Sequence, residues 1–258
     1  MVRWFQRFMG GLALLVAFAA AAGAAGERVS FPGAGPTAGM TLSATLYRAT
    51  VPGRGPAVVL LHTCAGITPF EEDWAAWFAA HGYHALVVDS FKPRFVVSVC
   101  LHPGAPTPND RAFDALGALA WLRTQPEVDP ARIGAIGWSH GGGTALAADV
   151  PLMVANAGVA GGGFRAVAAL YPTCRMVRPT ALAAPLLLLT GGKDEWTPPS
   201  TCDALVAGLA PGSPAVTRTT YPEATHAFDN PRTDGHRVSA NGAMFYLRYD
   251  SSAAADAH

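Results

Sequence analysis

The chain has 258 residues, and half of them are hydrophobic, which suits one compact α/β domain with a sizeable core. Its 18 basic residues balance its 18 acidic residues without forming a basic stripe, so the composition argues against a nucleic-acid-binding protein. Only 14% of the residues are charged, which also argues against a disordered binding protein.

Residues 1–25 have the pattern of a secretory signal peptide. Arg3 and Arg7 precede an apolar run over residues 12–22, and the small residues that follow fit a cleavage site. We therefore expect residues 1–25 to be removed, leaving a single domain over residues 26–258 in the periplasm or outside the cell. The alternative is an N-terminal membrane anchor, but the run is short and rich in Ala and Gly. No later segment is apolar for long enough to span a bilayer, so no stable membrane span is expected after cleavage.

Strand and helix patterns alternate along the rest of the chain. Residues 26–55 predict one or two antiparallel edge strands, and the continuous apolar run over residues 57–62 predicts the first buried strand. A helix is expected after Thr68, where Pro69 and Glu71 complete a capping box. Further strands are expected at residues 85–89, 133–136, 166–171, 186–190 and 216–221, and further helices at residues 109–125, after residue 139, and at residues 200–209. This alternation predicts a mostly parallel sheet with helices on both faces.

The segment over residues 90–108 is irregular and contains four prolines. It is long for a plain connection between a strand and a helix, so we expect it to lie over a functional site.

The pattern Gly-x-Ser-x-Gly over residues 137–141 is the first indication of chemistry. It lies between a predicted strand and a small-residue helix, which is the context of a nucleophile elbow. The sharp turn lifts Ser139 clear of the sheet and leaves room only for small residues two positions before and after it. Because a Gly-rich turn can produce the same pattern by chance, the motif needs support from the rest of the chain.

That support comes from two residues that follow later strands. Asp194 comes after the strand at residues 186–190, and His226 after the last strand, so the order is nucleophile, acid and base. A histidine can take the proton of a serine, and a carboxylate can orient that histidine. The adjacent Glu195 is the alternative acid, but Asp194 is favoured by its position. The backbone N–H groups of His140 and Cys64 are expected to bind the oxyanion.

The four cysteines are expected to form disulfides, as is usual in an exported protein with an even number of cysteines. Three pairings are possible. We prefer Cys174 with Cys202, because both follow predicted strands, which leaves Cys64 with Cys100. Buried free thiols are the alternative.

Signals for the substrate are weaker. Arg94, Arg175 and Arg178 follow strands and could bind a carboxylate, although arginines are more often exposed or ion-paired. Trp138 and Trp196 flank candidate catalytic residues and could line an apolar pocket, although core packing explains them equally well. His62 and Cys64 are too few ligands for a metal site, so neither a metal nor a cofactor is expected.

Five stretches together resemble dienelactone hydrolase-like members of the α/β-hydrolase superfamily, between about residues 57 and 231. They are residues 62–66 (HTCAG), 89–94 (DSFKPR), the elbow itself, 192–198 (GKDEWTP) and 225–231 (THAFDNP). The resemblance implies an α/β-hydrolase fold. Two positions depart from the family pattern, because founding members have a cysteine where Ser139 stands and a glutamate where Thr63 stands. A general serine esterase is therefore expected rather than an enol-lactone hydrolase.

We expect an exported, cofactor-independent serine hydrolase that acts on a small ester or lactone. An acyltransferase with the same residues is one alternative. An inactive hydrolase fold used for binding is another, and it gains weight because the C-terminal helix is expected to be shorter than in similar chains.

Overall fold

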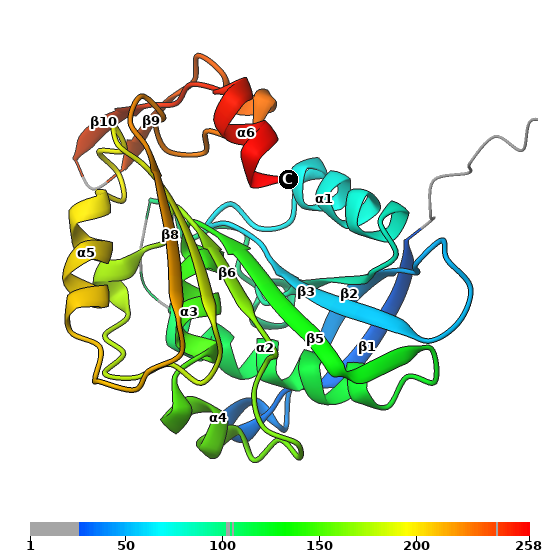
Figure 1. The fold of residues 1–258 in the computed structure, drawn as a ribbon. Helices are drawn as coiled ribbons and strands as arrows, with labels where there is room; N and C mark the ends of the chain where they lie inside the picture. Colours follow the sequence, from blue (N-terminus) through cyan, green and yellow to red (C-terminus); the bar gives the residue numbers. More distant parts are fainter. Residues whose placement is uncertain (1–25, 102–103, 105, 241) are drawn as a thin grey trace, which may run out of the picture.

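The computed structural model describes residues 26–101, 104, 106–240 and 242–258 (Figure 1). The predicted signal peptide at residues 1–25 lies outside this range. Within it, no helix is both long and apolar enough to cross a membrane.

An eight-stranded sheet forms the centre of the molecule, with the strand order β1-β2-β4-β3-β5-β6-β7-β8 (Figure 1). The strands are β1 (Glu27–Pro32), β2 (Thr41–Tyr47), β3 (Gly55–Leu61), β4 (His84–Asp89), β5 (Val128–Trp138), β6 (Val167–Leu170), β7 (Leu186–Gly191) and β8 (Val216–Tyr221). Strand β2 pairs antiparallel with both β1 and β4, whereas the strands from β4 to β8 pair in parallel. The predicted mostly parallel sheet with an antiparallel edge is confirmed.

Helices cover both faces of this sheet, as predicted. The helices are α1 (Pro69–Ala80), α2 (Pro108–Arg123), α3 (His140–Ala148), α4 (Pro151–Ala157), α5 (Pro199–Ala207) and α6 (Ser251–Ala257). Strand β3 shows why two layers are needed, because its alternate side chains enter different cores. Val59 and Leu61 pack with residues of α2 and α3, whereas Val58 and Leu60 pack with residues of α1 and α6.

Helix α1 begins as its sequence predicts. The Oγ1 atom of Thr68 accepts a hydrogen bond from the Phe70 N–H at 3.3 Å, and the Glu71 carboxylate accepts one from the Thr68 N–H at 2.9 Å. This reciprocal capping box satisfies N–H groups that have no partner inside the helix.

Three elements were not predicted from the sequence. They are helix α4 and the two strands of a small hairpin, β9 (Arg237–Ala240) and β10 (Ala243–Tyr246). The C-terminal helix α6 has seven residues, in line with the expectation of a short final helix. The Asp250 carboxylate caps it by accepting the N–H groups of Ser252 and Ala253.

Both preferred disulfide pairings are present. Cys64 is bonded to Cys100, which joins the loop after β3 to the long segment at residues 90–108. Cys174 is bonded to Cys202, which joins the loop after β6 to helix α5.

Candidate active site

Ser139 lies on a strained turn between β5 and α3. Its φ of 53° and ψ of −113° are unusual for a residue with a side chain. A Cβ atom on Gly137 would lie 2.1 Å from the Gly141 carbonyl oxygen, and one on Gly141 would lie 1.9 Å from the Leu61 carbonyl oxygen. Only glycine fits at these two positions, which explains the spacing of the motif. The turn has the backbone geometry of a nucleophile elbow.

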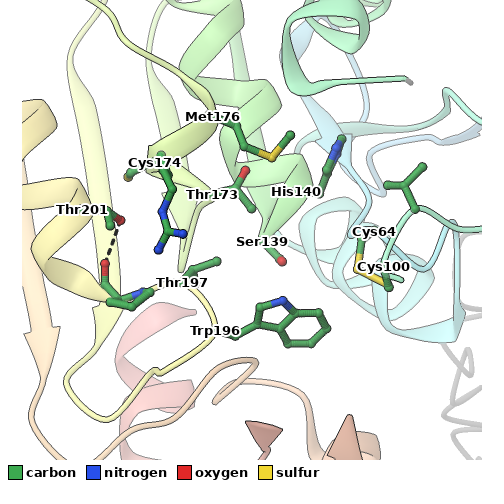
Figure 2. Close-up of a pocket in the computed structure, with 13 residues that line it drawn as sticks. Cys64, Cys100, Ser139, His140, Thr173, Cys174, Met176, Trp196, Thr197 and Thr201 are labelled. Carbon is green, nitrogen blue, oxygen red and sulfur yellow. Dashed lines mark hydrogen bonds between the residues drawn. A yellow bond between two sulfur atoms is a disulfide. The ribbon is translucent and has the colours of Figure 1, made fainter. Parts of the chain in front are cut away.

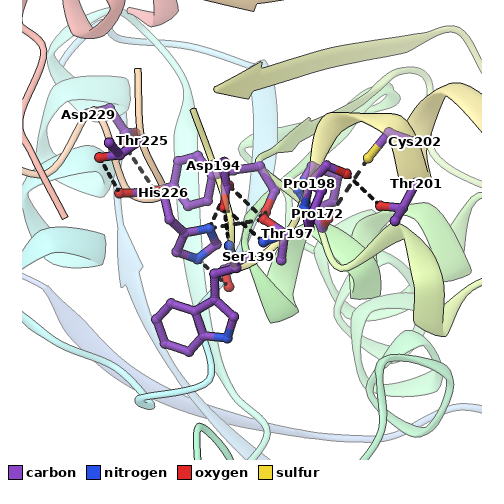
Figure 3. A network of polar contacts seen from close by, with 12 residues as sticks. Ser139, Pro172, Asp194, Thr197, Pro198, Thr201, Cys202, Thr225, His226 and Asp229 are labelled. Carbon is purple, nitrogen blue, oxygen red and sulfur yellow. Dashed lines mark hydrogen bonds and ion pairs between the residues drawn. The ribbon is translucent and has the colours of Figure 1, made fainter. Parts of the chain in front are cut away.

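Three side chains from distant loops meet at this turn (Figure 3). The Ser139 Oγ atom lies 2.9 Å from the His226 Nε2 atom, and the His226 Nδ1 atom lies 2.8 Å from the Asp194 Oδ2 atom. All three residues are buried, with exposed fractions of 3 to 4%. A proton on Nδ1 is therefore held by the carboxylate, and the lone pair on Nε2 faces the serine hydroxyl. The neighbouring Glu195, the alternative acid, is exposed and makes no described hydrogen bond to His226.

The Asp194 carboxylate is fixed by the turn that follows it. Its Oδ1 atom accepts the N–H groups of Trp196 and Thr197 at 2.9 and 2.8 Å. The Thr197 Oγ1 atom lies 2.8 Å from Asp194 Oδ2 and 3.0 Å from His226 Nδ1. The sequence reasoning did not assign Thr197 a role in the site. An aspartate followed three residues later by threonine is typical of such a side-chain-capped turn, so a local signal was present.

Aromatic rings enclose His226 on two sides. The rings of Tyr171 and Trp196 each lie 4.8 Å from the imidazole, measured between centroids. Behind Tyr171, the fully buried Asp229 carboxylate accepts the Tyr171 hydroxyl at 2.7 Å and the Trp138 Nε1–H at 3.0 Å. Burial raises the pKa of Asp229 to about 6, against the hydrogen bonds from these two donors.

A pocket of about 280 Å³ opens beside Ser139 (Figure 2). Its lining includes Trp196, Arg175, Met176 and the Cys64–Cys100 disulfide. Val99 and Cys100 belong to the long segment at residues 90–108, so part of that segment lies at the site as expected. The volume is at the small end of the range for ligand pockets. Among the described residues, no group of three or more His, Cys, Asp or Glu side chains is arranged to hold a metal ion.

Three residues considered for substrate contact, Trp138, Arg94 and Arg178, do not line this pocket. Trp138 is fully buried beneath the elbow, where its indole packs against Phe70 and Trp74. Arg94 forms two hydrogen bonds with the Asp114 carboxylate, at 2.8 and 3.0 Å, and does not line the pocket. Trp138 and Arg94 each contact a buried partner that the sequence alone does not reveal, whereas Arg178 is exposed. Of the substrate candidates in the sequence, Trp196 and Arg175 line the pocket.

The two residues expected to donate to an oxyanion, His140 and Cys64, both lie at the pocket that contains Ser139. His140 is the first residue of α3, so its N–H has no acceptor within the helix. Cys64 follows the end of β3, and in the described part of the chain its N–H donates to no other protein group. Both residues line the pocket together with Ser139. Two free N–H groups beside a hydroxyl can stabilise negative charge on an oxygen atom bound there.

Comparison with known protein families shows which family this chain belongs to. The model of the dienelactone hydrolase family matches residues 42–258, which is most of the described structure. The chain belongs to the dienelactone hydrolase family. The matched range contains the elbow, His226 and Asp194, and all four cysteines of the two disulfides.

Individual relatives are more distant. An uncharacterised protein of Mycobacterium tuberculosis strain H37Rv is 31% identical over 189 residues, which cover 67% of this chain and 64% of the relative. This chain therefore spans less than two thirds of that relative's length. A Bradyrhizobium protein described as a probable 2-oxo-3-(5-oxofuran-2-ylidene)propanoate lactonase is 26% identical over 226 residues, covering 83% of this chain and 91% of the relative.

Solved structures agree on the fold of this dienelactone hydrolase family member. A dienelactone hydrolase-like promiscuous phosphotriesterase from metagenomic libraries aligns with a TM-score of 0.69 at 20% identity, covering 90% of this chain and 94% of that one. Esterase 2 of Thermogutta terrifontis aligns with a TM-score of 0.59 at 18% identity, covering 80% and 85%. These likenesses establish the α/β-hydrolase fold.

Proposed function

We propose that this member of the dienelactone hydrolase family is an exported serine hydrolase of the carboxylesterase or lactonase type, which cleaves small esters or lactones. The observation that carries the proposal is the 2.9 Å contact between the Ser139 hydroxyl and His226 Nε2, continued at 2.8 Å from Nδ1 to Asp194. An unaided serine hydroxyl is a weak nucleophile, and this relay supplies the base it needs.

The proposed reaction proceeds in two halves. His226 Nε2 accepts the hydroxyl proton as Ser139 Oγ attacks the substrate carbonyl carbon, and Asp194 stabilises the imidazolium that forms. The N–H groups of His140 and Cys64 stabilise the oxyanion of the tetrahedral intermediate. The imidazolium then protonates the leaving alkoxide, which leaves an acyl group on Ser139. A water molecule, deprotonated by His226, releases the acid and restores the serine.

The pocket supports a small substrate. Its volume of about 280 Å³ accommodates a short acyl or lactone group between Trp196 and the Cys64–Cys100 disulfide. The name of the Bradyrhizobium relative, a probable lactonase, adds support for a lactone. Arg175 is exposed at the pocket, and its guanidinium could bind a carboxylate on the substrate.

Export is part of the proposal. Residues 1–25 carry the signal-peptide pattern, and the disulfides Cys64–Cys100 and Cys174–Cys202 are stable in an oxidising compartment. Cell fractionation of a strain that expresses the full chain tests it. We expect a shortened protein in the periplasm or medium, and a full-length protein in the cytoplasm would contradict export.

Labelling with a fluorophosphonate probe tests the serine. We expect the purified protein to be labelled at Ser139, and the Ser139→Ala variant not to be labelled. Labelling of neither protein would favour the inactive binding fold. Turnover of p-nitrophenyl esters and lactones, with and without an added alcohol, then separates hydrolysis from acyl transfer, because a transferase forms a new ester with the alcohol.

A further inference from the structure

A buried arginine lies behind the candidate active site. Arg111 is on helix α2 and has no exposed surface. Its Nη1 atom lies 2.7 Å from the His140 Nδ1 atom, and its Nη2 atom donates to the His62 carbonyl oxygen at 2.8 Å. The ring of Phe91 packs against the guanidinium, 5.0 Å from centroid to Cζ.

The protonation states of these groups make Arg111 the donor in both contacts. Burial, together with the charge of Arg111, lowers the pKa of His140 to about 3, so this imidazole is neutral. Burial lowers the pKa of Arg111 itself to about 9, which leaves it a cation at neutral pH. The guanidinium therefore donates to the lone pair on His140 Nδ1.

Each of the two groups that Arg111 contacts is close in sequence to one of the proposed oxyanion donors. His140 carries one proposed donor on its own backbone. The His62 carbonyl belongs to the loop that carries the other donor, two residues before Cys64. On the far side of this loop, the buried Glu71 carboxylate accepts the Thr63 N–H at 3.3 Å. The loop is thus held at consecutive residues by two buried side chains from different helices.

Burying a charged guanidinium is costly unless its donors are satisfied, so a buried arginine needs a compensating role. The Arg111 fork is planar and rigid, and its two nitrogen atoms fix the distance between the groups they contact. A lysine or an uncharged side chain could not hold both groups in this way. No other described hydrogen bond joins the His140 side chain to the loop at residues 62–66.

We infer that Arg111 is a positioning residue that holds the backbone donors of His140 and Cys64 at the separation an oxyanion requires. The inference rests on the proposed serine hydrolase function, because it assigns a task within that reaction. Arg111 does not line the pocket, and its described hydrogen bonds go to His140 and His62 rather than to Ser139. Its effect is expected in the transition state, where the oxyanion exists, and not in the binding of the uncharged ground-state substrate.

The test compares two arginines of the same helix. Arg111→Met removes the fork, whereas Arg123→Met removes a guanidinium that donates to the carbonyls of residues 160–163, away from the pocket. We expect Arg111→Met to lower kcat for a p-nitrophenyl ester about 10- to 100-fold with little change in KM, because small displacements of catalytic groups have effects of this size. Arg123→Met is expected to keep the wild-type kcat.

A transition-state analogue separates positioning from a general structural defect. A trifluoromethyl ketone forms a tetrahedral adduct with a nucleophilic serine and places an oxyanion between the two donors. We expect its Ki to rise in Arg111→Met by about the factor by which kcat/KM falls. A fall in kcat without a rise in Ki would overturn the inference, and so would wild-type values of both.

Two more variants complete the test. His140→Leu breaks the same contact from the other end but keeps the backbone donor, so its effect and that of Arg111→Met are expected to be non-additive. Full additivity would contradict the inference. If Arg111→Met does not fold, Arg111→Lys keeps the charge but cannot reach both acceptors, and a smaller rise in Ki is expected. An inactive wild-type protein would reject the proposed function itself, whereas an active wild type with unaffected Arg111 variants would reject only this inference.

Discussion

The hydroxyl of Thr197 contacts three groups of the candidate active site. Its Oγ1 atom is within 3.0 Å of the Asp194 carboxylate, the His226 Nδ1 atom and the Tyr171 carbonyl oxygen. A hydroxyl has one proton, so it can donate to only one of the two oxygen acceptors while it accepts from the Nδ1–H. With the proton on Nδ1, that N–H faces both the Thr197 hydroxyl oxygen and the Asp194 carboxylate, so both contacts restrict the orientation of the imidazole.

We expect Thr197→Val to lower kcat/KM about tenfold. The variant keeps the shape of the side chain but removes the hydroxyl, while Asp194 retains its two backbone donors. Thr190→Val is the control, because it removes another buried hydroxyl, one that pairs with Thr220 on the next strand. Ester turnover measures both. Equal rates in the Thr197 variant and the wild type would show that Asp194 alone orients the base.

His226→Ala is expected to have a larger effect. Without the imidazole, nothing within hydrogen-bond distance of Ser139 Oγ can accept its proton among the described contacts. We expect ester turnover to fall by at least about 100-fold, which is the scale of lost general-base catalysis. Near-normal turnover would mean that another group is the base. His236→Ala, at an exposed loop histidine, is the matched control.

Among the larger elements, the segment at residues 90–108 is tied most directly to the site. The Cys64–Cys100 disulfide joins it to the loop after β3, and the Val99 N–H donates to the Cys64 carbonyl oxygen at 2.9 Å. The Cys174–Cys202 disulfide instead joins the loop after β6 to helix α5, and although Cys174 also lines the pocket, neither of its cysteines is a proposed oxyanion donor. The bonds close loops of similar size, with sequence separations of 36 and 28 residues. We therefore expect the two disulfides to have similar effects on stability but different effects on the reaction.

Paired serine substitutions test this difference. Loop-closure entropy predicts that the loss of either disulfide lowers the free energy of unfolding by about 4 kcal/mol. We expect the Cys64→Ser/Cys100→Ser variant also to lose kcat, because Cys64 carries a proposed oxyanion donor. The Cys174→Ser/Cys202→Ser variant is expected to lose stability with a smaller change in kcat. Urea unfolding and ester turnover measure the two effects, and an equal loss of kcat in both variants would contradict the assignment.

At the scale of the whole molecule, two buried carboxyl groups make the free energy of unfolding depend on pH. Burial raises the pKa of Asp149 to about 7 and that of Asp229 to about 6. In an unfolded chain each would titrate near about 3.9. Between these values the folded protein holds protons that the unfolded chain has released. The contribution of these two groups to the free energy of unfolding is therefore expected to fall as the pH rises from about 4 to about 7, by at most about 1.4 kcal/mol per pH unit for each group. The buried His140, whose pKa is lowered to about 3, contributes in the opposite direction.

Asp149→Asn tests this linkage. The amide oxygen can still accept the Ala184 N–H, which the Asp149 Oδ1 atom accepts at 2.9 Å. Because the pKa of Asp149 is about 7, we expect the melting temperature of the wild-type protein, measured relative to that of the variant, to fall between pH 5 and pH 7. Asp73→Asn, at an exposed carboxylate, is expected to follow the wild type. Parallel curves for Asp149→Asn and the wild type would contradict the linkage.

The local parts of this protein could be predicted because their signals lie within a few residues. The elbow needs glycine two positions before and after Ser139, and the helix after Thr68 is marked by its own capping box. The parallel sheet follows from the alternation of strands and helices. Chain order then predicts that Asp194 and His226 belong beside Ser139, since the carboxyl ends of parallel strands meet at one edge of the sheet.

Tertiary structure decided what each remaining polar or aromatic side chain does, because those contacts join residues far apart in the chain. Trp138 donates to Asp229, 91 residues away, and so lies in the core rather than in the pocket. Arg94 forms an ion pair with Asp114, 20 residues away, and so does not reach the pocket. Arg111 contacts His140 across 29 residues, and no local pattern marks such a contact. Sequence periodicity reports which residues are buried, whereas only the packed fold determines which buried groups satisfy one another.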